Sequence, residues 1–328
     1  MRQEQFIEQN EALWDQFREL ATDLSKSRFK QTSKPADQEQ IPKIYRRLCS
    51  HYALAQSRSY SPGLVGELHD LVLLGHKLLY RRQESWLWRV LAFIGVGFPR
   101  ALRRNVKYFW VSLFLFVAPM ALLGGYCYSK PDLIYSVLAD DRVASVEYMY
   151  DPVNHKPGRT KERSSESDVY MFGFYISNNI SVGFRTFAGG ILFGIGTVFF
   201  LLFNGVFIGS IAGHLTRLGS GEPFWSFVSG HGSFELTAIV ICGGAGLMLA
   251  RATIAPGQST RIMALKKISK EAVLLVCGAT LMLVVAAFIE AFWSSMQLDA
   301  GTKYFAAAVL WIFVIAYLGL SGKSDHGS

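Results

Sequence analysis

The sequence predicts an all-α fold: a polytopic membrane helix bundle of five to six spans, preceded by an N-terminal cytoplasmic helical domain. Hydrophobic residues make up 51% of the 328 residues and charged residues only 18%, below the roughly 25% typical of soluble domains. After residue 107 the apolar residues gather into runs of about 20, the length that crosses a bilayer. Residues 1–108 carry 18 Lys and Arg against 11 Asp and Glu, so most of the net charge of +8 precedes these runs.

Residues 1–83 form the predicted cytoplasmic domain. Apolar residues near helical spacing predict helices over 4–24, 41–59 and 63–83. A polar stretch at 25–40 separates the first two helices. The aromatic and basic residues of this domain are expected to make solvated faces and headgroup contacts, and a specific anion site is the alternative. No basic motif with interleaved aromatic residues indicates nucleic acid as a partner.

The next segments predict the approach to the membrane and the first crossing. Residues 84–106 favour an amphipathic helix lying in the interface, because Trp86 and Trp88 stand beside a short apolar stretch that ends in a basic flank. The first clear span is 107–128, and the positive charge before it places the N-terminal domain in the cytoplasm. The hydrophilic segment 129–169 is then expected to be an external loop, long enough to touch an external partner.

Further apolar runs complete a transmembrane domain that covers residues 107–320 and is followed by a C-terminal tail. These runs cover 187–213, 234–250, 272–293 and 303–320, and the tail is 321–328. If these were the only spans besides 107–128, the basic loop Arg251–Lys270 would lie on the external side of the membrane, which contradicts the positive-inside rule. A sixth crossing or re-entrant segment at 170–187 removes the conflict and returns the C-terminus to the cytoplasm. Five and six crossings both stay open, and six is preferred.

Small residues at spacings of four predict close helix packing in two of these spans. One reading is packing between helices of one subunit, and the other is self-association, most simply as a homodimer. The glycines concerned are Gly190, Gly194, Gly205, Gly209, Gly243 and Gly246.

Polar residues near or within the spans are the candidate functional residues. His231 and Glu235 are four apart and would share one helix face, and Glu290 ends the following span at the same expected depth. One interpretation is a buried hydrogen-bond network that fixes helix register, and the other is a site for protons, ions or substrate. The proposed buried polar network comprises Asn178, Asn179, Arg185, Asn204, His231, Glu235 and Glu290.

No motif predicts an enzyme, a cofactor or a metal. The sequence lacks GxxxxGK[ST], HExxH and GxSxG. One histidine and two distant glutamates are one or two ligands short of a convincing catalytic zinc site. The four cysteines lie far apart without a CxxC pair, so a disulfide framework or structural zinc site is not expected. The polar start of the chain, MRQEQFIEQNEALWDQF, predicts no cleaved signal peptide.

Three linked stretches resemble the stage II sporulation protein M family. They are SNNISVGFRTFAGGILFGIGTVFFLLFNGVFIG at 177–209, HGSFELTAIVICGGAGL at 231–247, and the APGQSTR…AFIEAF run that ends at Phe292. The opening FIEQNEALWDQF and the LLYRR stretch at 78–82 extend the resemblance over most of the chain. The charged insert near 151–168 departs from the family pattern.

The resemblance implies a non-enzymatic integral membrane protein of the bacterial cytoplasmic (inner) membrane. The family's namesake is similar to a scaffold that assembles wall-degrading partners at the septum of spore formers. Relatives outside spore formers are often encoded beside a MoxR-type ATPase. The function expected here is therefore a membrane scaffold that recruits cell-wall proteins or a MoxR-type ATPase system. The alternative is a transporter or channel for a small solute, ion or lipid that uses the Asn/His/Glu network.

Overall fold

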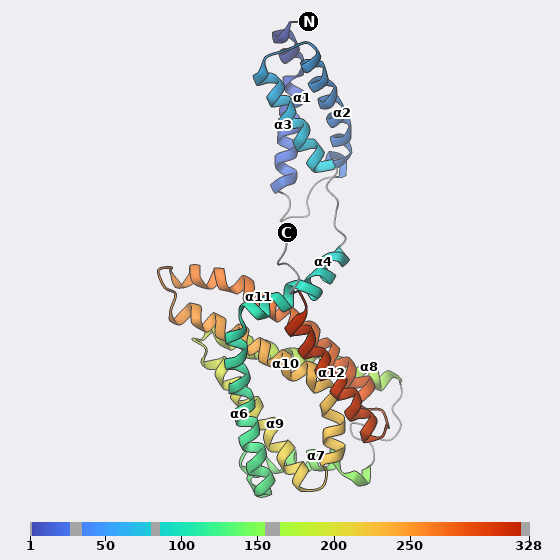
Figure 1. Cartoon of the computed structure of the whole chain (residues 1–328), viewed down its shortest axis with the longest axis vertical. Coiled ribbons are helices and arrows are strands. Elements are labelled where there is room, and N and C mark those ends of the chain that lie inside the picture. Colours follow the sequence, from blue (N-terminus) through green and yellow to red (C-terminus); the bar gives the residue numbers. More distant parts are fainter. Residues whose placement is uncertain (1, 27–34, 80–85, 155–164, 323–328) are drawn as a thin grey trace. The chain divides into compact units, whose positions relative to one another are not determined.

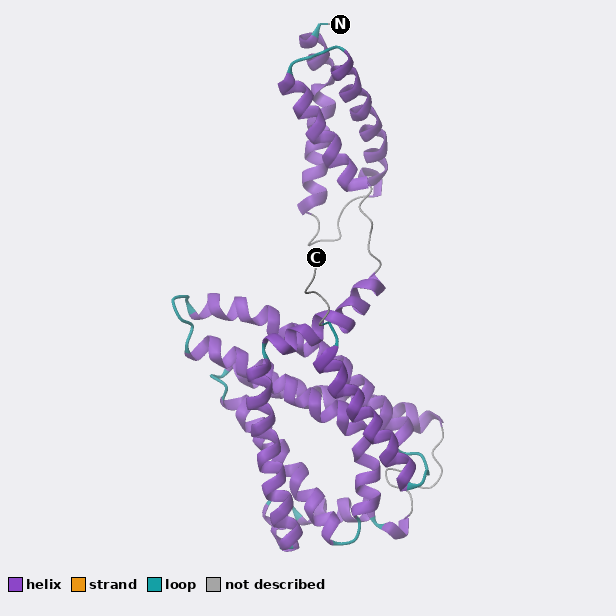
Figure 2. Ribbon diagram, in the orientation of Figure 1, coloured by secondary structure: helices purple, strands orange, loops and turns teal. Residues whose placement is uncertain are grey.

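The computed structural model describes residues 2–26, 35–79, 86–154 and 165–322. The chain divides into two compact units, Met1–Trp86 and Leu87–Ser328, and each is described by itself (Figure 1). All regular structure in the described ranges is helical, and no strand occurs in them (Figure 2). The predicted all-α class is thereby confirmed.

Unit 1 is a three-helix bundle with its own core, formed by α1 (Gln3–Lys26), α2 (Pro35–Ser57) and α3 (Pro62–Leu79). Trp14, Phe17 and Leu48 are among its fully buried side chains. Helix α2 begins six residues before its predicted start at residue 41, because proline is well tolerated in the first helical turn. The end of the predicted helix 63–83 and part of the predicted break at 25–40 lie outside the described residues.

A polar contact joins α1 to α2 inside the core of unit 1. The Trp14 indole N–H donates to His51 Nδ1 over 3.1 Å, so this nitrogen must be unprotonated to accept. Burial lowers the pKa of His51 below its usual value, and the positive charge of Arg47 adds to the effect. Both effects favour the neutral imidazole that the hydrogen bond requires.

Unit 2 begins with three short helical segments where the sequence predicts one interfacial helix over 84–106. They are α4 (Trp86–Ala92), the π-helical turn η2 (Phe93–Gly97) and α5 (Phe98–Arg104). The α-helix resumes at α5, where Pro99 occupies the first turn. Tyr317 donates to the Ile94 carbonyl over 2.6 Å and Arg103 to the Leu318 carbonyl over 3.0 Å. These bonds place the C-terminal end of the last helix beside the start of unit 2.

Among the residues that the structure describes in unit 2, five helices are long and apolar enough to cross a membrane. They are α6 (Val106–Ser129), α9 (Ile195–Arg217), α10 (Gly221–Ile254), α11 (Arg261–Phe288) continued by the π-helical turn η6 (Ile289–Ser294), and α12 (Ala300–Leu320). Helix α10 is the central one, since it contacts each of the others and is the most deeply buried. Large apolar side chains such as Phe114, Phe305 and Ile312 are exposed on the outer helices, as expected for surfaces that face lipid.

The packing of α6 against α9 favours the six-crossing arrangement over the five-crossing one. Three glycines of α9 lie against the α6 backbone, in the order Gly205 on Phe116, Gly209 on Met120 and Gly213 on Gly124. Both helices therefore run in the same direction, and the chain between them must return across the membrane. Helix α8 (Ser165–Ala188) makes this return: its 24 residues cover about 36 Å, enough for the hydrocarbon core of about 30 Å.

The contacts at the two ends of α8 show that it runs the length of the bundle. Near its start, the Phe172 ring meets those of Phe288 and Phe292 at the end of α11. At its other end, the Thr186 carbonyl accepts from Thr197 Oγ1, near the start of α9, over 2.6 Å. If α8 is counted with the five apolar helices, the described part of unit 2 matches the six-crossing arrangement preferred from the sequence; by length and apolar composition alone, five helices qualify.

Two expected segment boundaries are wrong, for local backbone reasons. The span expected over 187–213 is interrupted by a 3-10 turn, η5 (Gly189–Ile191), and by Phe193 and Gly194, both at positive φ. A left-handed conformation ends a right-handed helix, so α9 starts only at Ile195. The external loop expected over 129–169 ends earlier, since α8 already begins at Ser165.

The segment after α6 folds into a small cap, where the sequence predicted only a hydrophilic loop. It contains η3 (Pro131–Ser136), α7 (Asp140–Tyr150) and η4 (Pro152–Asn154). Its buried side chains Ile134, Val143 and Tyr150 pack on the ends of α9 and α10, at Leu215, Phe224 and Phe227. The side of unit 2 that carries this cap is called the α7 side below, and the opposite side, with the start of α11, is called the basic side.

Candidate functional site

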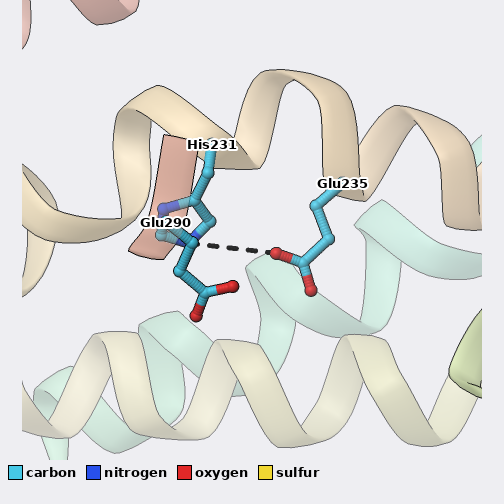
Figure 3. A group of neighbouring side chains, drawn as sticks. All are labelled: His231, Glu235 and Glu290. Atoms are coloured by element: carbon cyan, nitrogen blue, oxygen red, sulfur yellow. Dashed lines mark ion pairs between the residues drawn. The ribbon is translucent and has the colours of Figure 1, made fainter. Parts of the chain in front are cut away.

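A histidine and two glutamates meet on the α7 side of α10 (Figure 3). His231 and Glu235 lie one helical turn apart on α10, with His231 Nε2 and Glu235 Oε2 separated by 3.8 Å. Glu290 reaches them from η6, and the nearest ligand atoms of all three residues lie within 4.8 Å of one another. His231 is 4% exposed and the Glu235 side chain 20%, so the group is largely shielded.

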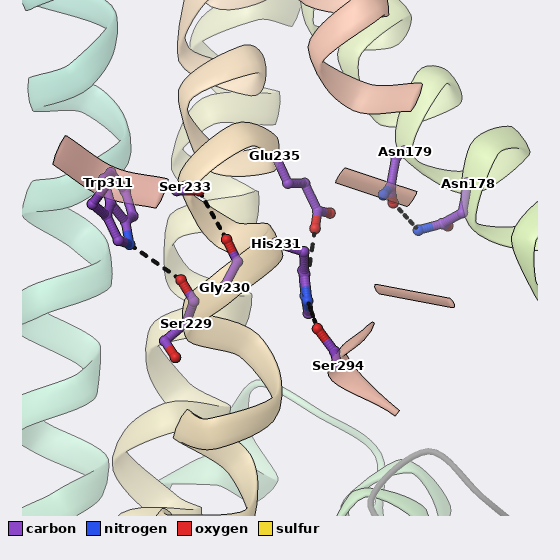
Figure 4. Close-up of polar contacts among 9 residues, drawn as sticks. All are labelled: Asn178, Asn179, Ser229, Gly230, His231, Ser233, Glu235, Ser294 and Trp311. Atoms are coloured by element: carbon purple, nitrogen blue, oxygen red, sulfur yellow. Dashed lines mark hydrogen bonds and ion pairs between the residues drawn. The ribbon is translucent and has the colours of Figure 1, made fainter. Parts of the chain in front are cut away.

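The π-helical turn η6 sets the position of Glu290. It adds a wider turn at the end of α11 and includes both Glu290 and Ser294. Turns of this kind are rare and occur frequently at functional sites. Because the wider turn shifts the helix face, Glu290 and Ser294 lie beside His231, as Figures 3 and 4 show for the two residues in turn.

Ser294 holds the imidazole from the other side. Its hydroxyl lies 3.0 Å from His231 Nδ1 (Figure 4), while its carbonyl accepts from Lys303 Nζ over 2.9 Å. If Nδ1 donates to this hydroxyl, the Nε2 lone pair points toward Glu235. On another face of α10, Trp311 Nε1 donates to the Ser229 carbonyl over 3.2 Å, so α12 contacts α10 at the same level.

Asn179 of α8 is the amide that comes closest to this group. It is 1% exposed and near enough to interact with the Glu290 carboxylate. Its Oδ1 accepts from Asn178 Nδ2 over 3.2 Å. Its Nδ2 and Glu290 Oε2 are buried and, within the described part of the chain, lack a hydrogen-bond partner. Two buried polar atoms therefore face this region with unused bonding capacity.

A cavity of about 250 Å³ opens beside the three residues. It lies between the cap and the membrane helices and is lined mostly by apolar side chains. Its lining comprises Tyr150, Phe207, Ile208, Ile211, Phe224, Phe227, Val228, His231, Gly232, Glu235, Leu236 and Glu290. Burial raises the pKa of Tyr150 well above its usual range, and the negative charge of Glu290 adds to the effect. Tyr150 therefore stays protonated and offers its hydroxyl as a donor at the cap side of the cavity.

The depth of the group follows from α11. The basic residues of this helix end at Lys270, and a crossing takes about 20 residues. Glu290 therefore lies near the opposite edge of the hydrocarbon core, where the cap begins. A site at this level can exchange small ligands with water on the α7 side.

Other residues of the expected polar network lie elsewhere. Arg185 is exposed near the basic end of α8, where its long side chain can reach the headgroups. Asn204 is half-buried and donates to the Phe200 carbonyl of its own helix over 2.7 Å. Asn178 is exposed and contacts the site only through Asn179. The structure thus brings together His231, Glu235, Glu290 and Asn179. The other three expected members of the network lie apart from this group.

The expected packing glycines all make close contacts within one chain. Gly190 lies against Gly246, and Gly194, at positive φ, lies against Ala250. Gly243 meets Ser112 and Leu201, while Gly205 and Gly209 contact α6. A Cβ atom at any of the six would overlap a neighbouring atom, so the helices can approach this closely only because the residues are glycines.

A second histidine–glutamate pair was not anticipated from the sequence. His214 of α9 is 3% exposed. Its Nε2 atom lies 2.7 Å from Oε1 of Glu147, a residue of α7. Its Nδ1 lies 3.1 Å from the Pro131 carbonyl. A carbonyl only accepts, so Nδ1 is the donor in this contact. The pair fastens α7 and η3 to α9, and no spacing rule connects residues so far apart in sequence.

The crossing helices define the class of this molecule: an all-helical polytopic membrane protein with a separately packed helical unit before it. The chain belongs to the stage II sporulation protein M family, whose model matches residues 112–295. A second family model, described as a domain of unknown function (DUF8413), matches residues 4–81 and hence unit 1. An uncharacterized protein of Methanocaldococcus jannaschii (MJ0793) is 29% identical over 133 residues, which cover 38% of this chain and 70% of that relative. No solved structure matches the chain.

Proposed function

We propose that this chain is a non-enzymatic membrane scaffold that holds partner proteins at a bacterial cytoplasmic membrane. The observation that carries the proposal is the division of the chain into two units. Unit 1 packs a hydrophobic core of its own, and a separate family model matches it. A unit that folds apart from the membrane helices offers a surface for recruitment. The cap on the α7 side of unit 2 offers a second surface.

The packing of α10 supports a scaffold over a transporter. A solute path from the 250 Å³ cavity along α10 would have to pass the glycines at 243–246. There α10 lies directly against the backbones of α6 and α8, at Tyr108 and Phe187. Backbone contacts of this kind cannot open by side-chain rotation. This face of α10 is therefore sealed where a path would need to continue.

The charge distribution supports a cytoplasmic basic side. Arg104 pairs with Glu271 over 3.2 Å, so the basic flank before α6 and the start of α11 lie on one side of unit 2. Arg251, Arg261 and Lys266 belong to the same side. By the positive-inside rule, this charge supports a cytoplasmic location for this side and, with it, for the N-terminus.

Cysteine labelling in intact cells tests the orientation. With the four native cysteines replaced, Asp141→Cys in the cap is expected to react with an impermeant reagent. Lys266→Cys at the start of α11 is expected to react only after the cells are opened. Both side chains are exposed, so access to solvent is matched. Reaction of position 266 in intact cells would reverse the proposed orientation.

Site-specific photo-crosslinking tests recruitment. A crosslinker placed at Arg47 or Leu74, both exposed on unit 1, is expected to capture the MoxR-type ATPase of a host that encodes one. Placed at Phe313, which is exposed on α12, the crosslinker is expected to capture no ATPase. Absence of an ATPase adduct from both unit 1 positions would refute this partner.

A homodimer is also part of the proposal, but the glycine faces do not carry it, because α6 and α8 of the same chain occupy them. Association would instead use an exposed apolar face, such as the stacked Phe199, Phe203 and Phe207 of α9. Native mass spectrometry in mild detergent tests this. A monomer as the sole species would count against the dimer.

A further inference from the structure

We propose that His231, Glu235 and Glu290 bind a divalent transition-metal ion, for which Zn²⁺ is the probe. The proposal does not depend on the scaffold function. It begins with charge: in the described part of the chain, no Lys or Arg forms an ion pair with either carboxylate. Two neighbouring carboxylates at the edge of the hydrocarbon core need a proton or a cation to offset their burial.

The three side chains form a suitable ligand set. One imidazole nitrogen and two carboxylate oxygens suit Zn²⁺ and related ions. Two ligands of one Zn²⁺ ion, each about 2.1 Å from it, lie at most about 4.2 Å apart. His231 Nε2 and Glu235 Oε2 are already 3.8 Å apart, and the whole set lies within 4.8 Å. Small rotations of the glutamate side chains complete the geometry.

The surroundings of the three ligands also match a metal site. Histidines that bind metals usually donate their second ring nitrogen to a nearby acceptor, and Ser294 Oγ is placed to accept from His231 Nδ1 at 3.0 Å. Asn179, 1% exposed, faces Glu290 with its Nδ2 atom lacking a partner among the described residues. It can donate to Glu290 and orient that carboxylate.

The fourth coordination position would face the cavity beside the cluster. Its 250 Å³ leave room for a water molecule on the ion. The Tyr150 hydroxyl lines the same cavity and can hydrogen-bond to that water. An ion at this place would join α10 to η6 directly beneath the cap, and so couple the cap to the membrane helices.

Metal titration of the purified full chain tests the proposal. The chain is stripped with a chelator, and Zn²⁺ alone is added in competition with a metal indicator. One Zn²⁺ per chain is expected at this site. His231→Gln and Glu290→Gln are each expected to weaken binding by more than about 100-fold, and Ser294→Ala by about 10- to 100-fold, the range typical of second-layer partners. Binding as strong in His231→Gln and Glu290→Gln as in the native chain would overturn the proposal.

The second histidine–glutamate pair provides matched controls. His214→Gln and Glu147→Gln change the same residue types in a pair elsewhere in the chain, of which His214 is buried, and they should leave Zn²⁺ affinity unchanged. Should the site variants fail to fold, Co²⁺ bound to the native chain decides the question. Ligand-field bands of four-coordinate Co²⁺ without thiolate charge transfer support the proposal, because the cysteines are not ligands. Thiolate charge transfer, or no bound Co²⁺, overturns it.

Discussion

From Gly221 to Glu235, α10 packs through large aromatic and polar side chains, whereas from Ala238 to Ile254 it packs mainly through small residues. In the first half, Phe224, Phe227 and His231 surround a cavity of about 250 Å³. In the second half, Gly244 and Gly246 let neighbouring backbones contact the helix directly. Side chains can rotate around a ligand and backbones cannot, so the first half can host binding and the second half fixes the bundle.

The largest expected effect comes from adding a side chain to the glycine half. Gly246→Leu would place atoms on Thr197 Oγ1 and on the α8 backbone at Phe187. Overpacking typically costs about 1–3 kcal/mol and occasionally more. Here the obstacle is backbone, so we expect a loss at or above about 3 kcal/mol and little folded protein. Yield and thermal unfolding in detergent measure it.

Gly173 of α8 is the matched control, since nothing lies within 4 Å of a Cβ at that position. Gly173→Leu should fold with nearly native stability. If Gly246→Leu also has the same unfolding temperature as the unsubstituted chain, the proposed contrast between the two halves of α10 is wrong.

The polar half is expected to tolerate replacement of a carboxylate by an amide better than a loss of polarity. Glu235→Leu leaves His231 Nε2 without its carboxylate neighbour and should cost about 1–3 kcal/mol. Glu235→Gln keeps an oxygen and the shape, so its cost should be smaller. Chemical denaturation of both variants measures the difference. Equal stability of Leu and Gln variants would mean that no buried partner depends on this side chain.

The membrane helices could be predicted from the sequence because their apolar runs are long. The prediction failed where the backbone angles of a few residues set the end of a helix. Nothing in FAGGILFGIG indicates that Phe193 and Gly194 take positive φ and divide the expected span. The cap was missed for another reason. Its buried residues, Ile134, Val143 and Tyr150, are diluted by charged neighbours, and they find their partners on α9 and α10 rather than within the segment.

The candidate site was partly predictable. Spacing of four placed His231 and Glu235 on one face, and equal depth brought Glu290 to the same level. Sequence could not distinguish Asn179 from the other candidate asparagines, because the choice depends on how α8 is rotated. It also gave no sign of Ser294, whose position depends on the π-helical turn η6, or of Tyr150, which approaches from the cap.

A smaller effect is expected where α12 supports the polar half. Lys303 is 5% exposed and donates to the Ser294 carbonyl over 2.9 Å. Lys303→Met keeps the length and apolar stem but removes the donor. We expect a loss of about 1.5–2 kcal/mol, at the low end of the range for a hydrogen bond from a charged group. Thermal unfolding measures it, and Lys303→Arg is the conservative comparison. A more stable Met variant would show that the desolvated charge costs more than its hydrogen bond contributes.

The smallest expected effect has the opposite sign and concerns neighbouring glycines of α6. Gly125 is exposed and a Cβ there would meet nothing within 4 Å, whereas a Cβ at Gly124 would lie 3.4 Å from the Gly209 carbonyl oxygen. Alanine favours a helix over glycine by about 0.8–1 kcal/mol. Gly125→Ala should therefore raise the free energy of unfolding by up to about that amount, and Gly124→Ala by a similar amount, because its methyl group would make an ordinary van der Waals contact with α9. Denaturant titrations of the pair measure the difference. A loss of stability at position 124 would mean that the α6–α9 contact tolerates side chains as poorly as the glycine half of α10.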